Sequence, residues 1–102
     1  MGIEGYRKHF QAHLRLTILL ILAEAPGYRA NNSIIHTSVE SVGLPATRDQ
    51  VRTELAWLEE QELVSLEHPS ATMIVGSLTE RGHDVATARA TCPGVQRPAP
   101  KG

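Results

Sequence analysis

The segment from Tyr6 to Ala25 constrains the fold of this 102-residue sequence most strongly, because it predicts a helix that is apolar on several faces. One apolar set recurs at helical spacing and comprises Tyr6, Phe10, Leu14, Ile18 and Ile21. A second set covers other faces of the helix and comprises Leu16, Leu19, Leu20 and Ala23. Pro26-Gly27 ends the pattern. Such a helix must be covered on more than one side, either as the core helix of a monomer or partly as a dimer surface.

The charge balance and the cysteine count exclude several classes of protein. Ten Lys and Arg against eleven Asp and Glu give a net charge of -1, so the chain cannot bind nucleic acid or anionic lipid by overall charge alone. Any nucleic-acid contact must come from local clustering. Cys92 is the only cysteine, which excludes an intramolecular disulfide framework and a cysteine-rich zinc site.

The sequence predicts a cytoplasmic protein that does not enter a membrane. The apolar run from Ile18 to Ala23 is too short to span a bilayer. The first ten residues carry several charges and are not followed by a cleavage pattern, so no signal peptide is expected. The single cysteine fits a reducing compartment.

Strong start and stop signals define two further helices. Residues 28–30 are expected to be extended, and Asn31 or Asn32 to begin a helix that ends at Gly43. The apolar stripe of that helix comprises Ile34, Ile35, Val39 and Val42. Thr47-Arg48-Asp49-Gln50 is a capping-box pattern that begins the next helix, predicted over 47–61.

The helix over 47–61 divides into an inward and an outward face. Its inward stripe comprises Val51, Leu55 and Leu58, with Trp57 on one flank. The residues expected to face outward are Arg48, Asp49, Arg52, Thr53 and Ala56.

Beyond Gln61 the periodicity changes to that of a β-hairpin. The strands are predicted over 63–67 and 72–75, with the four residues 68–71 as the tip. Thr79-Glu80 then begins a last helix to about Ala90. Residues 91–102 contain three prolines and show no apolar stripe, so they are expected to form a tail outside a domain of residues 1–90.

This order of elements predicts a mainly α fold with a β-hairpin wing, the winged helix-turn-helix. The run Leu78 to Ala86 resembles the segment that follows the wing in MarR-, PadR- and ArsR-type winged helices. Four segments together resemble small winged-helix proteins of Mu-like phages and prophages: residues 16–28, residues 48–53 with 55–58, residues 78–86, and residues 93–95 with 97–98. The resemblance implies a transcriptional regulator that binds double-stranded DNA.

Two departures from that family are visible. Winged helices commonly have Gly between the recognition helix and the first wing strand, where this chain has Glu62. Glu62 must therefore adopt a positive φ angle, at about 1 to 2 kcal/mol, or the helix must end differently. The cysteine-containing sites of metal-sensing ArsR proteins have no counterpart in a chain with one cysteine, so metal sensing is not carried over.

The candidate DNA-binding residues lie at the start of the predicted recognition helix. Arg48 and Arg52 occupy its first two turns, from which side chains reach base edges in a major groove. Shorter polar contacts are expected from Thr47, Gln50 and Thr53. The alternative interpretation is that both arginines are solvated or paired with Asp49 or Glu59.

Other chemistry-bearing residues have simpler explanations. The i, i+4 pair His9 and His13 lacks a nearby carboxylate or cysteine to complete a metal site. Tyr28, Asn31 and Asn32 are candidates for phosphate contacts at the start of the second helix, but helix capping already explains the two asparagines. No catalytic constellation is present, so we expect neither an enzyme nor a bound cofactor or metal.

Two hypotheses about function follow from the sequence. The first is a DNA-binding regulator that forms a homodimer through its N-terminal helix. The second is a winged helix that binds a host or phage protein through its acidic helix and tail. An uncharged wing tip, His68-Pro69-Ser70-Ala71, and five glutamates after Arg52 favour the second hypothesis.

Overall fold

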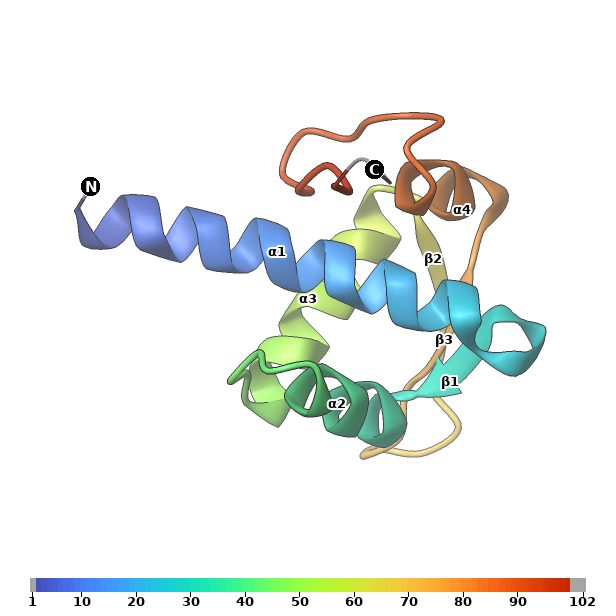
Figure 1. Cartoon of the computed structure of the whole chain (residues 1–102). Helices are drawn as coiled ribbons and strands as arrows, with labels where there is room; N and C mark the ends of the chain where they lie inside the picture. The colour runs from blue at the N-terminus through green and yellow to red at the C-terminus, as the bar shows by residue number, and fades with distance from the viewer. Residues whose placement is uncertain (1, 100–102) are drawn as a thin grey trace.

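The computed structural model describes residues 2–99 and has helices, a short sheet and a packed C-terminal segment (Figure 1). The elements in chain order are α1 (Ile3–Glu24), the 3-10 turn η1 (Pro26–Tyr28), β1 (Arg29–Asn31), α2 (Asn32–Ser41), α3 (Arg48–Glu60), β2 (Val64–Glu67), β3 (Val75–Leu78) and α4 (Glu80–Ala86).

Helix α1 is the centre of the fold and contacts α2, α3, α4 and β3. Its buried apolar residues are Leu14, Leu16, Ile18, Leu19 and Leu22, which confirms a helix covered on more than one side. It begins at Ile3, three residues before the predicted start, and its first turns project beyond the body of the molecule (Figure 1). Tyr6, predicted to lie in the apolar stripe, is therefore exposed.

The three strands form an antiparallel sheet in the order β1-β3-β2. Strand β3 lies three residues later than predicted, because Ala30 of β1 pairs with Gly76 and Leu66 of β2 pairs with the same glycine. The hairpin loop consequently spans residues 68–74 instead of the predicted four. A hydrogen bond from the Ile74 amide to Asn32 Oδ1 (3.1 Å) holds the end of this loop against α2.

Helix α2 is capped by Asn31, whose side chain accepts a hydrogen bond from the Ile34 amide. Its predicted apolar stripe is only half correct. Ile35 and Val39 are buried, whereas Ile34 and Val42 are exposed. The helix lies at the edge of the fold, with α1 and α3 on its inner side only, so the outer part of the stripe has no cover.

Helix α3 has the predicted capping box at its start and an unusual end. The C-cap is Gln61, and Glu62 follows with φ +62°, so Glu62 takes the left-handed conformation itself. The Leu63 amide then donates to the Leu58 carbonyl (3.0 Å), which satisfies one of the last carbonyls of the helix.

The C-terminal part of the chain differs most from the sequence-based expectation. Helix α4 ends at Ala86, four residues early, because Ala88 reverses the chain with φ +66°. Residues 91–99 are not a loose tail, since Cys92 and Val95 are buried in the main core. A turn at Gly94 brings these two side chains to one face, and the Gln96 amide donates to the Ala12 carbonyl of α1 (3.1 Å). The last predicted tail residues, 100–102, lie outside the described residues.

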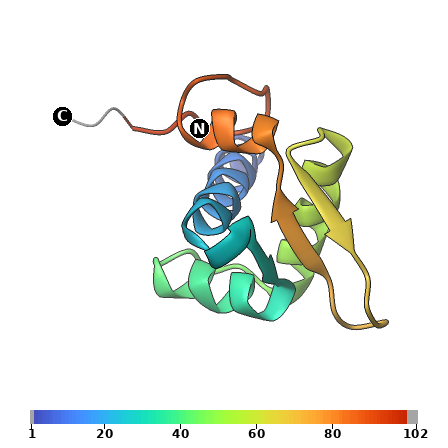
Figure 2. The same ribbon diagram turned by 90° about the vertical axis from the view of Figure 1, so that its right-hand side faces the viewer.

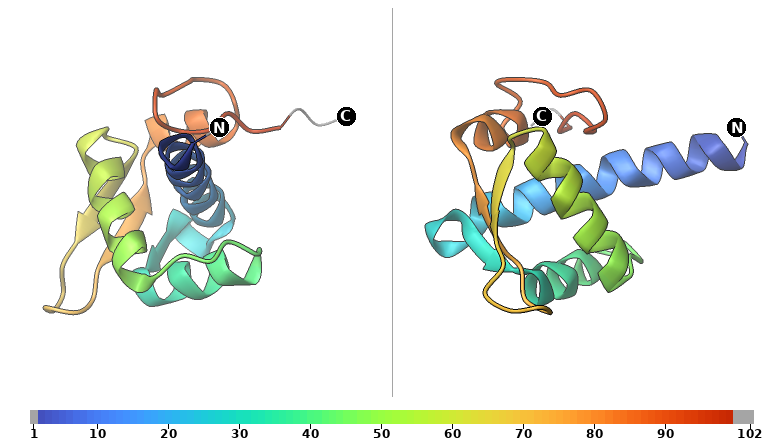
Figure 3. Two further views of the ribbon diagram at one scale, coloured as in Figure 1. Left: turned by 90° about the vertical axis from the view of Figure 1, so that its left-hand side faces the viewer. Right: turned by 180° about the vertical axis from the view of Figure 1, so that it is seen from behind.

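The arrangement of these elements is a winged helix-turn-helix, as the sequence predicts. Helices α2 and α3 form the helix-turn-helix, and the β2–β3 hairpin stands beside α3 as the wing (Figures 2 and 3). Within residues 2–99, no helix is long and apolar enough to cross a membrane.

Candidate nucleic-acid interface

The start of α3 and the β2–β3 loop lie at the same end of the molecule. Figure 1 shows both at the bottom of the view, with α4 and the C-terminal segment at the top. Figure 3 shows the same arrangement from two other sides. This end therefore presents a helix and a neighbouring loop together, the combination with which winged helices contact a duplex.

Arg48 and Arg52 are exposed on the outer face of α3, one turn apart. Among residues 2–99, neither guanidinium group forms an ion pair or a hydrogen bond with another part of the chain. Both groups are therefore available for an anionic or hydrogen-bond-accepting partner. A guanidinium group can donate two parallel hydrogen bonds to a guanine edge or bind the adjoining phosphates.

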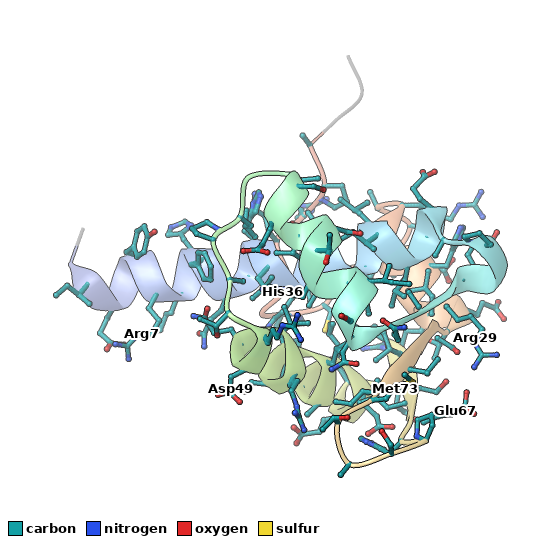
Figure 4. The ribbon with its side chains drawn as sticks, turned by 90° about the horizontal axis from the view of Figure 1, so that it is seen from below. Arg7, Arg29, His36, Asp49, Glu67 and Met73 are labelled. Carbon is teal, nitrogen blue, oxygen red and sulfur yellow. The ribbon has the colours of Figure 1, made fainter. Side chains whose placement is uncertain are left out.

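The carboxylates that the sequence suggested as competitors lie elsewhere. Glu59 accepts a hydrogen bond from the Leu66 amide (3.1 Å) and is thereby turned toward β2. Asp49 points outward from the first turn of α3 (Figure 4), where a negative charge is favourable at a helix N-terminus. Neither carboxylate neutralises Arg48 or Arg52.

Thr47 and Gln50 are held in place by the capping box. The Thr47 hydroxyl oxygen accepts from the Gln50 amide (3.0 Å), and Gln50 Oε1 accepts from the Thr47 amide (2.8 Å). Each side chain keeps a free donor, the hydroxyl proton of Thr47 and the Nε2 group of Gln50. With exposed Thr53, the five predicted site residues thus lie together on the outward side of α3's first two turns.

A buried charge, which the sequence analysis did not identify, fixes α3 against α1. Glu54 is 4% exposed, and its carboxylate accepts a 2.7 Å hydrogen bond from Arg15 Nε. The Arg15 guanidinium also lies 3.8 Å from the ring centre of Trp57 and donates to the Gly94 carbonyl (3.0 Å). The signal was present, because Glu54 falls between Val51 and Leu58 on the inward stripe.

The wing adds shape to this end of the molecule without adding positive charge. Residues 68–74 include neither Lys nor Arg. Figure 4 shows Met73 on the loop and Arg29 close to Glu67, the residue of β2 from which the loop starts. Arg29 donates to the Glu67 carboxylate (3.0 Å), which neutralises the arginine nearest to the wing.

The other candidate residues take structural positions. Asn31 caps α2, and Asn32 bonds the wing loop at Thr72 and Ile74. Tyr28 packs edge-on against His83. Cys92 is buried, contrary to the exposed tail position expected for it.

The histidine pair of α1 also lacks the partners of a metal site. His13 lies within 3.2 Å of Gln96 Oε1. No group of three or more potential metal ligands occurs within residues 2–99.

Comparisons with known proteins give both a family and a fold. No protein-family model matches the chain. The chain is 41% identical over 87 residues to uncharacterized protein gp26 of Escherichia phage Mu, covering 85% of this chain and 88% of gp26. It is 46% identical over 67 residues to an uncharacterized protein of Haemophilus influenzae, covering 66% of this chain and 65% of that protein.

Two solved structures share the fold. The complex structure of hsRosR-S1 has a TM-score of 0.61 at 20% identity, and the match covers 74% of this chain and 65% of that one. The structure of H. salinarum RosR has a TM-score of 0.63 at 19% identity, covering 74% and 67%. These likenesses extend to the fold and support the winged-helix assignment.

Proposed function

Because this chain belongs to the family of gp26 of Escherichia phage Mu, we propose that it is a phage or prophage regulator that binds double-stranded DNA. In this proposal α3 enters the major groove in a sequence-specific manner and controls transcription. Arg48 and Arg52 read base edges or grip phosphates, while Thr47, Gln50 and Thr53 add shorter polar contacts. The protein acts as a homodimer on an imperfect palindrome.

The observation that carries this proposal is the pair of exposed arginines on the outer face of α3, Arg48 and Arg52. In a chain with net charge -1, two adjacent guanidinium groups that have no carboxylate partner within residues 2–99 form a local positive site. The site lies on the one helix that a winged helix offers to a major groove. The neutral wing limits the number of phosphates contacted, so the affinity should depend only weakly on salt concentration.

A second function is favoured by the acidic surface beyond these arginines. Glu59, Glu60 and Glu62 are all exposed on or just after the second half of α3. This surface would repel a duplex and suits a basic protein partner, such as a host or phage protein. The packing of residues 91–99 on α1 removes most of the predicted tail from such an interface.

A mobility-shift assay separates the two functions. The folded protein is titrated against fragments of the DNA that flanks its own gene, with an excess of unrelated competitor DNA. We expect one fragment to be retarded in the presence of the competitor. Failure to retard any flanking fragment at micromolar protein would contradict sequence-specific binding and favour the protein-interaction module.

A further inference from the structure

Helix α1 leaves two apolar surfaces uncovered, one on each half of its length. On the projecting N-terminal turns, Ile3 is 78% exposed and Tyr6 is 65% exposed, and the Tyr6 ring stacks on Phe10 with centroids 6.4 Å apart. On the C-terminal half, Leu20 is exposed beside the exposed Ile34 of α2. Neither surface has a cover within residues 2–99.

Leu20 stands between two grooves. The first, of about 580 Å³, runs between α1 and α2 and includes Ile21, Ile34 and Val42 in its walls. The second, of about 1100 Å³, lies on the other side of α1, against the end of α4 and residues 96–99. Leu20 is thus a ridge with a hollow on each side, a surface suited to receive another helix.

One row of side chains along α1, exposed except for half-buried Phe10 and for Thr17 in the wall of the α1–α2 groove, follows the spacing of a two-helix seam. Successive steps of three and four residues connect Ile3, Tyr6, Phe10, His13, Thr17, Leu20 and Glu24. This a/d pattern is the one with which two helices pack along their whole length. The 22 residues of α1 span about 33 Å, enough for three heptads.

We infer that the occupant of this seam is α1 of a second copy of the chain, packed antiparallel. The a and d positions of antiparallel helices face each other, so Ile3 lies against Leu20 of the partner. Tyr6 then lies against Thr17 of the partner, and Phe10 against its His13. The projecting turns of each copy thereby cover the grooved half of the other.

The charges near the seam do not oppose this pairing. Glu24 is the only carboxylate among the residues that line the α1–α2 groove, and no Lys or Arg lines it. On the projecting turns that enter this groove, Arg7 pairs with Glu4 of the same helix (3.6 Å), so its charge is balanced within its own chain. Figure 4 shows Arg7 on these turns, well away from the body of its own chain.

The direction of pairing also rests on the proposed function. An antiparallel pair has its two-fold axis perpendicular to α1, and one such axis is vertical in the view of Figure 1. Rotation about that axis leaves the lower end of both copies, with the start of α3 and the wing, on the same side. A parallel pair would turn one of these ends away from the other, so that both could not meet one straight duplex.

Disulfide cross-linking tests the pairing without DNA. Chains carrying Ile3→Cys and chains carrying Leu20→Cys are mixed and oxidised mildly, and the parent, whose only cysteine is buried Cys92, is the control. We expect the mixed disulfide to dominate at least tenfold over the Leu20→Cys self-disulfide. In the antiparallel pair two Leu20→Cys positions lie about 26 Å apart along the helix, too far for a bond. Predominant self-disulfides would overturn the antiparallel arrangement.

Sedimentation equilibrium tests the pairing of two chains independently of DNA binding. The parent at tens of micromolar should sediment at twice the 11.1 kDa chain mass, and Leu20→Lys, with unchanged circular dichroism, at the chain mass itself. A parent of 11.1 kDa would overturn the pairing even if the mobility shift were positive. A cross-linked dimer that fails to retard DNA would instead contradict only the proposed function.

Discussion

At the scale of single residues, Arg15 joins three parts of the chain that are distant in sequence. Its guanidinium group bonds Glu54 of α3, covers Trp57 and reaches the Gly94 carbonyl. Both partners of the ion pair are largely removed from water, with side-chain exposures of 13% and 5%. The outer face of α3 is therefore held in a fixed orientation by a contact on its inner face.

We predict that Glu54→Ala destabilises the protein by about 3 kcal/mol, because it leaves the buried Arg15 charge without its partner. Glu60→Ala is the matched control, since Glu60 is an exposed carboxylate on the same helix and should change stability by less than about 0.5 kcal/mol. Urea unfolding followed by circular dichroism measures both. Equal unfolding midpoints for the parent and Glu54→Ala would contradict the role given to this pair.

Residue-scale sequence reasoning succeeded where a local rule decides the outcome. The capping box of Thr47 and Gln50 depends on neighbours in the chain and is confirmed, and the positive φ at Glu62 is one of the two helix ends that the sequence allowed. The burial of Cys92 depends on a reversal at Ala88 and a turn at Gly94 that return the chain to α1. Residues 91–99 contain no periodic apolar pattern that would predict this contact.

At the scale of elements, the end of α3 carries a conformational cost. Glu62 adopts φ +62°, a conformation that a residue with a Cβ atom adopts unfavourably by about 1 to 2 kcal/mol. The cost is tolerated because the following Leu63 amide bonds Leu58 and Leu63 itself is fully buried. With Glu62 in this conformation, the chain turns from α3 into β2 as it would with the glycine that winged helices commonly have at this position.

We expect Glu62→Gly to stabilise the protein by about 1 kcal/mol, because Gly takes this conformation without the steric penalty. The control is Glu60→Gly, which should cost about 1 kcal/mol inside the helix. Thermal unfolding of the two variants should therefore shift in opposite directions. A lower melting temperature for Glu62→Gly would show that the helix end is not strained.

The close packing of α4 gives a second element-scale prediction. An added Cβ on Gly82 would lie 2.0 Å from the Leu63 carbonyl oxygen and 2.8 Å from Leu78, so the helix and the wing strand would have to separate. Gly82→Ala should lower stability by at least about 3 kcal/mol in chemical denaturation. Gly2→Ala, which meets nothing within 4 Å, is the control and should be neutral.

The β2–β3 hairpin shows where a local sequence pattern fails to predict the bounds of an element. The hairpin was correctly predicted, but β3 lies three residues late, because the pairing of β1 with residues 75–77 decides its register. Residues 72–74 are apolar enough to form a strand, yet Asn32 holds them as a loop through Thr72 and Ile74. These are contacts over about 40 residues, which local periodicity does not contain.

At the scale of the whole molecule, the order of helices, hairpin and helix was sufficient to predict the winged helix. The central position of α1 followed from its apolar faces, and the outward face of α3 followed from its inward stripe. The packing of the C-terminal segment on α1 and the pairing of Glu54 with Arg15 could not be predicted, because both form only when distant segments meet. The fold thus brings the five predicted site residues together on the outward side of α3.

DNA recognition by α3 is tested most directly by a fluorescence-anisotropy titration of the fragment selected by the mobility shift. The parent is compared with the double variant Arg48→Ala, Arg52→Ala, after circular dichroism has shown that both are folded. Arg89→Ala is the control, because Arg89 is exposed near α4, at the opposite end of the molecule. Loss of each base-contacting arginine should weaken binding by about 1 to 3 kcal/mol, whereas Arg89→Ala should bind like the parent. Equal affinities of the parent and the double variant would contradict DNA recognition by α3.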